Sequence, residues 1–158
     1  IVYAFILTAQ NRRARGNERY EVTASYKTVS WASQNMLVLG LIILVGLLLH
    51  LYNFWGHMMF AELADIQVAH DPADGFAWIQ ETFSNPVFSV LYLIWIAALW
   101  FHLSHGFWSA FQTLGINGKI WLRRWQIIGG VYVTILMGVF AFLVLAFWLG
   151  FAPSMCLA

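Results

Sequence analysis

MLVLGLIILVGLLLHLY, residues Met36 to Tyr52, is the stretch of sequence that decides the fold. It contains no Asp, Glu, Lys or Arg and lies inside a longer apolar segment, residues 29–55. A helix needs about 20 mostly apolar residues to cross the hydrocarbon core of a bilayer. We therefore predict a transmembrane helix over residues 29–55.

The rest of the chain has the same character. Of its 158 residues, 61% are hydrophobic and only 9% are charged, and the mean hydropathy is +0.72. A soluble domain carries about 25% charged residues. Apolar segments over residues 86–114 and 125–151 predict two further spans, the second ending just before Pro153. We expect one domain, an all-α integral membrane helical bundle.

The opening segment IVYAFILTAQ, residues 1–10, is about half as long as a span and ends at a basic polar segment. We expect it to be the end of another transmembrane helix. On this interpretation, an N-terminal part of the natural protein is missing from the sequence.

Charged residues are divided unequally between the predicted loops. Residues 11–28 and 115–124 together contain all eight Lys and Arg residues. Residues 56–85 contain none, but carry Glu62, Asp65, Asp71, Asp74 and Glu81. Loops rich in Lys and Arg stay in the cytoplasm. Both basic loops are therefore predicted to be cytoplasmic and the acidic loop to lie outside.

The outer loop has two predicted parts. HDPAD, from His70 to Asp74, is typical of a turn. GFAWIQETF, from Gly75 to Phe83, predicts a short helix in the membrane interface, with aromatic side chains as anchors.

The ionisable side chains inside the predicted spans are histidines: His50, His102 and His105, with His57 near the outer edge. Polar groups at membrane depth are costly and usually functional. Neutral imidazole is a common axial ligand of haem iron. His50 and His102 are therefore candidate ligands of haem b.

The two candidates are predicted to lie at different depths. With a rise of about 1.5 Å per residue, His50 lies roughly 30 Å along its helix, towards the outer face. His102 falls in the inner half of its span, so the separation in depth is on the order of 10 Å. We expect two haems, each with one ligand from this chain and a second ligand from elsewhere.

The residues alone leave alternatives open. Gly46 and Gly106, each one turn from a candidate histidine, give room for a porphyrin or equally for a neighbouring helix. Each histidine taken alone fits a hydrogen bond to another helix about as well as it fits a ligand. His105 shares much of the face of His102, and one of this pair is expected to be a hydrogen-bonding or propionate-side group. His57 and His70 are expected to be interfacial and solvated.

Several motifs resemble the cytochrome b membrane anchor of succinate:quinone oxidoreductases, the succinate dehydrogenases and fumarate reductases. FHLSHGFWSAFQTLG, from Phe101 to Gly115, resembles the fourth-helix haem motif, with a ligand His, a Gly four residues later and a Gly at the cytoplasmic end. HLYNFW, starting at His50, resembles the end of the third helix, and LTAQNRRARGNERY, from Leu7 to Tyr20, the loop after the second. The resemblance covers nearly the whole chain. It is to the single-subunit, two-haem anchors of Bacteroidetes-like bacteria.

The resemblance implies five spans in the complete protein, with haem ligands on the first four. His102 would then bind the inner haem iron and His50 the outer haem iron. The second ligand of each haem would lie in the missing N-terminal part, and the residue preceding Ile1 in the natural protein would be a His. Trp31 and Ser33 are candidate contacts of the inner-haem propionates. Trp100 stands where some fumarate reductases have a Glu that serves proton movement, so that route is not expected here.

The resemblance also implies a function and partners. The chain would be the membrane anchor and electron-transfer subunit of respiratory complex II, itself without succinate chemistry, in the bacterial cytoplasmic membrane. Iron–sulfur and FAD-containing flavoprotein subunits would dock on the cytoplasmic face, and menaquinone would react near the outer haem. The residues Tyr52, Asn53, Trp55 and His57 lie near that depth. Two rival interpretations are the di-haem anchor of a formate dehydrogenase or hydrogenase, and a haem-free membrane scaffold.

Overall fold

The computed structural model describes residues 2–16, 31–116 and 118–151. In these ranges every regular element is a helix. Three helical stretches are long and apolar enough to cross a membrane, namely Met36–Leu63, Pro86–Thr113 and Ile120–Trp148. The prediction of an all-α membrane bundle is confirmed.

In chain order the elements are α1 (Val2–Arg15), α2 (Trp31–Gln34), α3 (Met36–His50), the π-helix η1 (Leu51–Phe60), α4 (Ala61–Leu63), α5 (Gly75–Ser84), α6 (Pro86–Thr113) and α7 (Lys119–Trp148).

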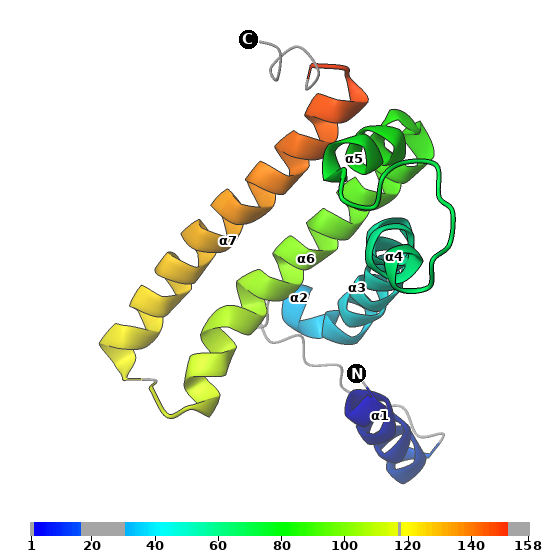
Figure 1. Ribbon diagram of the computed structural model, residues 1–158. Coiled ribbons are helices and arrows are strands. Elements are labelled where there is room, and N and C mark those ends of the chain that lie inside the picture. The colour runs from blue at the N-terminus through cyan, green and yellow to red at the C-terminus, as the bar shows by residue number, and fades with distance from the viewer. Residues whose placement is uncertain (1, 17–30, 117, 152–158) are drawn as a thin grey trace.

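The helix α6 is the centre of the molecule. It runs side by side with α7 over most of its length, and α3 packs on it from another side (Figure 1). Ile43, Gly46 and His50 of α3 all approach Trp95, so α3 crosses α6 near that residue. The short helix α5 packs against η1, α6 and α7. The half of the molecule that contains α5 and η1 is therefore closed on several sides.

The helix ends follow from local sequence. Asp74 and Asn85 are the N-caps of α5 and α6, and their side chains accept hydrogen bonds from the backbone N–H groups of Ala77 (3.1 Å) and Val87 (2.9 Å). Gly115 ends α6 with φ = 78° and Gly150 ends α7 with φ = 76°. A left-handed residue at this position lets the following N–H groups bond the last carbonyls of the helix, and glycine adopts it without strain.

Several boundaries differ from those expected. The first span continues beyond residue 55 because η1 and α4 extend it to Leu63. The helix α7 begins at Lys119, so Arg123 and Arg124 lie in its first turns and not in a loop. Long cationic side chains are tolerated there because their charged ends reach the interface. The helix α1 likewise runs into the basic segment as far as Arg15, whereas the predicted loop residues 17–28 lie outside the described residues.

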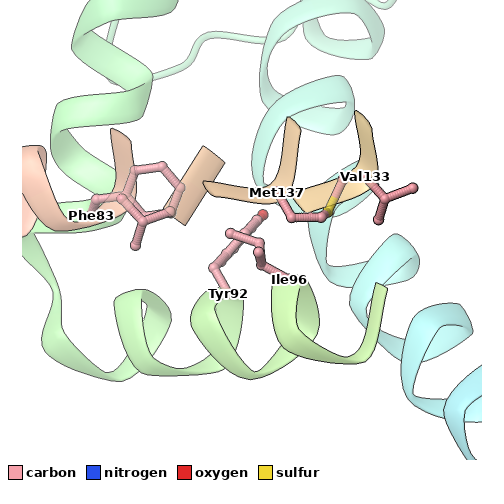
Figure 2. Packing of buried hydrophobic residues seen from close by; sticks show 6 residues of the cluster. Phe83, Tyr92, Ile96, Val133 and Met137 are labelled. Carbon is pink, nitrogen blue, oxygen red and sulfur yellow. The ribbon is translucent and has the colours of Figure 1, made fainter. Parts of the chain in front are cut away.

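The core joins α5, α6 and α7. Phe83, Tyr92, Ile96, Val133 and Met137 converge in Figure 2, and Val144 completes the cluster. Tyr92 is only 4% exposed and its ring packs edge-on against Phe83, with centroids 5.1 Å apart. This cluster packs on the N-terminal half of α6, the part that lies beside His50.

Candidate functional site

His50 lies at the junction of α3 and η1, and its imidazole packs against three aromatic rings on one side and is exposed on the other. The ring centroid is 5.1 Å from Phe54, 5.6 Å from Trp95 and 6.2 Å from Tyr92. The Trp95 indole is tilted by 31° from the imidazole plane, while the Tyr92 ring meets it edge-on. Among the described residues, neither nitrogen of His50 has a hydrogen-bond partner.

The two walls supplied by α6 are hydrogen-bonded back to the helix that carries His50. The indole N–H of Trp95 donates to the carbonyl oxygen of Ile43 at 3.1 Å, and the side-chain amide of Asn53 donates to the hydroxyl of Tyr92 at 3.4 Å. These two bonds lie on either side of His50 in the sequence. They clamp α6 to α3 and η1 around the imidazole.

Gly46 has a definite role in this packing. A Cβ atom at Gly46 would collide with the indole of Trp95. The space that the sequence offered to a porphyrin or to a neighbouring helix is therefore used by a side chain of α6. A planar ligand at His50 would have to approach from another direction.

One such direction is an apolar cavity of about 410 Å³ beside His50. Its walls come from η1, α5, α6 and α7, and they are almost entirely hydrocarbon. The aromatic members of the lining are Phe54, Phe83, Tyr92, Trp95, Phe140 and Phe147. Pockets for small molecules in proteins are typically apolar with few polar groups, and here the imidazole of His50 is such a group.

His102 lies on α6, seven residues after Trp95 and therefore on nearly the same face of the helix. Its Nδ1 atom is buried and has no hydrogen-bond partner among the described residues. Gly106, one turn further on, has nothing within 4 Å of the position of a Cβ atom. The structure therefore leaves open space one turn from His102, in contrast to the filled space at Gly46. His105 packs edge-on against Trp108, with centroids 5.1 Å apart.

The two candidate histidines lie at separate levels. His50 contacts Tyr92 and Trp95, so its level on α6 is that of residues 92–95. His102 is seven to ten residues further along, which corresponds to about 10–15 Å along the helix axis. Metal–imidazole bonds are about 2 Å long, so these two side chains are too far apart to bind one metal ion. In the described part of the chain, no three or more His, Cys, Asp or Glu side chains are grouped to hold a metal ion.

The other residues singled out from the sequence fall into two regions. Near His102, Trp31 packs against Phe101 with centroids 5.2 Å apart, so α2 lies at the level of His102. Ser33 belongs to the same short helix. Trp100 points elsewhere, because its indole N–H donates to the hydroxyl of Thr134 on α7 at 2.9 Å.

His57 and His70, which were expected to be interfacial and solvated, are half-buried in the structure. Both rings lie 5.2 Å from the ring of Trp78, which is only 5% exposed. His70 also approaches the carboxylate of Glu81, with an N–O distance of 3.1 Å. These contacts hold η1 and the segment between α4 and α5 against α5.

Sequence reasoning missed the aromatic residues that surround His50. The signal for Trp95 was present, because it lies two helical turns before His102 and so had to share its face. No such signal existed for Tyr92, because its contact with Asn53 depends on how α3 crosses α6.

No protein-family model, curated protein or solved structure matches this chain. The class of protein defined by the fold is that of multi-pass helical membrane proteins, with three helices of membrane-spanning length in the described residues.

Proposed function

We propose that this chain is a haem b-binding membrane anchor, in which His50 and His102 each supply one axial ligand to a separate haem. The observation that carries the proposal is the pairing of an unsatisfied imidazole with open space at two levels of the same bundle. At the inner level, the buried Nδ1 of His102 lacks a partner and Gly106 leaves room beside it. At the outer level, His50 borders an apolar cavity.

The residues present fit the group. Imidazole is a common haem ligand, and an apolar setting keeps it neutral and able to coordinate. The macrocycle is flat and largely hydrocarbon, which suits aromatic and aliphatic walls. Trp31 remains a candidate contact for the inner propionates because α2 lies at the level of His102. The second ligand of each haem would come from outside residues 2–151.

Haem held by histidine side chains would supply one-electron transfer between the partners of this chain. The residues of this chain would do the rest. His50 and His102 would hold the two haems at different depths, and the largely apolar cavity beside His50 would receive the outer one. The interhelical bond of Trp95 would hold α6 against α3 beside His50.

We further propose the physiological setting that the resemblance implies. The chain would be the anchor of a succinate:quinone oxidoreductase in a bacterial cytoplasmic membrane. Electrons would pass between an iron–sulfur subunit on the cytoplasmic face and menaquinone through the inner and then the outer position. FAD and iron–sulfur clusters would belong to partner subunits. The motif Phe101 to Gly115 supports this choice over other di-haem anchors.

The test is a dithionite-reduced minus oxidised spectrum of the full-length complex in mild detergent, with a pyridine haemochrome count per anchor. We expect a b-type band and two haems. His50→Ala and His102→Ala should each remove one haem, and a different one in each case. His70→Ala is the matched control, because His70 faces Trp78 and Glu81 at the outer edge and should leave both haems in place.

Well-folded protein without haem would leave a bare membrane scaffold as the function. Two haems that both survive His50→Ala would remove His50 from the proposal. Co-purification of a flavoprotein with succinate dehydrogenase activity would support the proposed complex, and a formate dehydrogenase or hydrogenase subunit in its place would support the rival anchor.

A further inference from the structure

A metal-bound imidazole is normally oriented by a hydrogen bond from its second nitrogen to a carbonyl, carboxylate or water. His50 has no such acceptor among the described residues. Its ring packs on one side against three others, those of Phe54, Tyr92 and Trp95. Phe54 is four residues after His50 in the same continuous helical stretch, formed by α3 and η1. Of the three residues, only Tyr92 and Trp95 come from a different helix, α6.

Each of those two side chains also makes a hydrogen bond to the helical stretch that carries His50. Trp95 occupies the space left by Gly46 and donates a hydrogen bond to the carbonyl of Ile43. The buried Tyr92 accepts a hydrogen bond from the buried Asn53. Ile43 precedes His50 and Asn53 follows it, so each wall is tied to the backbone segment that presents the imidazole. Both ties therefore hold the rings of Trp95 and Tyr92 in place beside the imidazole of His50, whose other side is exposed.

We infer that Trp95 and Tyr92 are positioning residues that fix the imidazole plane of His50, in the place of a hydrogen-bonded acceptor. The inference rests on the proposed haem ligation and deepens it. On this inference, α6 carries the proposed inner-haem ligand His102 and also orients His50, the proposed ligand of the outer haem. Neither Trp95 nor Tyr92 touches the iron in this role.

The consequence is spectroscopic. The orientation of an axial imidazole relative to the macrocycle changes the electronic structure of low-spin ferric iron, which electron paramagnetic resonance reports directly. The reduction potential responds as well, since ligand orientation and surroundings tune haem iron. A residue that contributes only to stability would move neither quantity while haem remains bound.

The experiment uses the full-length complex with the substitution His102→Ala, so that the remaining signal is that of the outer haem. In this background we compare Trp95→Phe and Tyr92→Phe. Tyr92→Phe removes one hydroxyl and keeps the ring, so the fold and the haem content should be preserved. We expect one haem per anchor in both variants, with a shifted low-spin signal and a shifted midpoint potential.

Two matched controls separate positioning from general loss of helix contacts. Trp100→Phe removes an interhelical tryptophan hydrogen bond from the same helix, but Trp100 bonds Thr134 and does not contact His50. Tyr132→Phe removes a hydroxyl from an exposed tyrosine of α7. Both should leave the outer-haem signal unchanged.

The failures are distinguishable. If the parent protein contains no haem, the proposed function fails and the inference fails with it. If His50→Ala removes the outer haem, but Trp95→Phe and Tyr92→Phe retain haem with an unshifted signal and potential, the function stands and the positioning role is wrong. A shift as large in Trp100→Phe as in Trp95→Phe would also overturn the inference.

Discussion

At the scale of single residues, the hydroxyl of Ser89 makes a hydrogen bond that links the first turns of α6 to the end of α5. Ser89 is fully buried at 0% exposure, and its Oγ donates to the carbonyl oxygen of Phe83 at 2.8 Å. That carbonyl belongs to the last turn of α5, where the helix itself supplies no donor. Ser89→Ala should destabilise the protein by about 1–3 kcal/mol, because it leaves a buried acceptor without a partner.

Unfolding in mixed detergent micelles, followed by tryptophan fluorescence, measures this loss. Ser84→Ala is the control, because the Oγ of Ser84 bonds the carbonyl of Gln80 on the same exposed helix turn. That change should stay within about 0.5 kcal/mol. Equal stability of the two variants would mean that another donor reaches the carbonyl of Phe83 once the hydroxyl is gone.

The candidate histidines can be predicted from the sequence, whereas the side chains around them cannot. His50 and His102 are visible from sequence because an ionisable side chain in an apolar span is rare and costly. Their surroundings are not visible in the same way. The partner of Gly46 is a tryptophan 49 residues further along the chain, and only the crossing of α3 and α6 brings the two together.

At the scale of helices, two glycines of the bundle serve close packing. A Cβ at Gly46 would collide with Trp95, and a Cβ at Gly129 would collide with Phe107. Both aromatic residues come from α6, so the same helix presses a large side chain onto the backbone of each neighbour. Gly46→Ala and Gly129→Ala should each cost about 1–3 kcal/mol through overpacking.

Matched controls lie on the same helices. Gly40 on α3 and Gly138 on α7 have nothing within 4 Å of a Cβ position. Alanine there should be neutral or stabilising by up to about 1 kcal/mol, because it favours the helical backbone. The measurement is the same micelle unfolding, with haem content recorded for Gly46→Ala. If all four variants behaved alike, helix propensity and not packing would explain the effect.

The helices themselves were largely predictable, and their irregularities were not. Spans follow from local hydrophobicity, and the short helix over Gly75–Ser84 follows from its N-cap and its aromatic pattern. The π-helix Leu51–Phe60 had no sequence signal. In a π-helix each backbone N–H bonds the carbonyl five residues back, whereas in an α-helix it bonds the carbonyl four residues back. The amino-acid composition does not indicate which of the two patterns forms. The π-helix nevertheless extends the first span and contains Asn53, one of the two ties around His50.

At the scale of the whole molecule, charge predicts orientation. The turn between α6 and α7 lies at one end of the bundle, and the acidic segment between α4 and α5 lies at the other (Figure 1). Since Lys and Arg remain on the cytoplasmic side, the α6–α7 end should face the cytoplasm. His102 would then be the histidine nearer the cytoplasmic partners and His50 the one nearer the outer face.

Cysteine labelling in whole cells tests this orientation independently of any haem. With Cys156 replaced by serine, a single cysteine is introduced as Gln67→Cys in the acidic segment or as Ile116→Cys in the α6–α7 turn, both at exposed positions. A membrane-impermeant maleimide should label Gln67→Cys in intact cells and Ile116→Cys only after permeabilisation. The reverse pattern would place His102 nearer the outside. Electrons from a cytoplasmic iron–sulfur subunit would then meet His50 first, and the assignment of inner and outer positions would have to be exchanged.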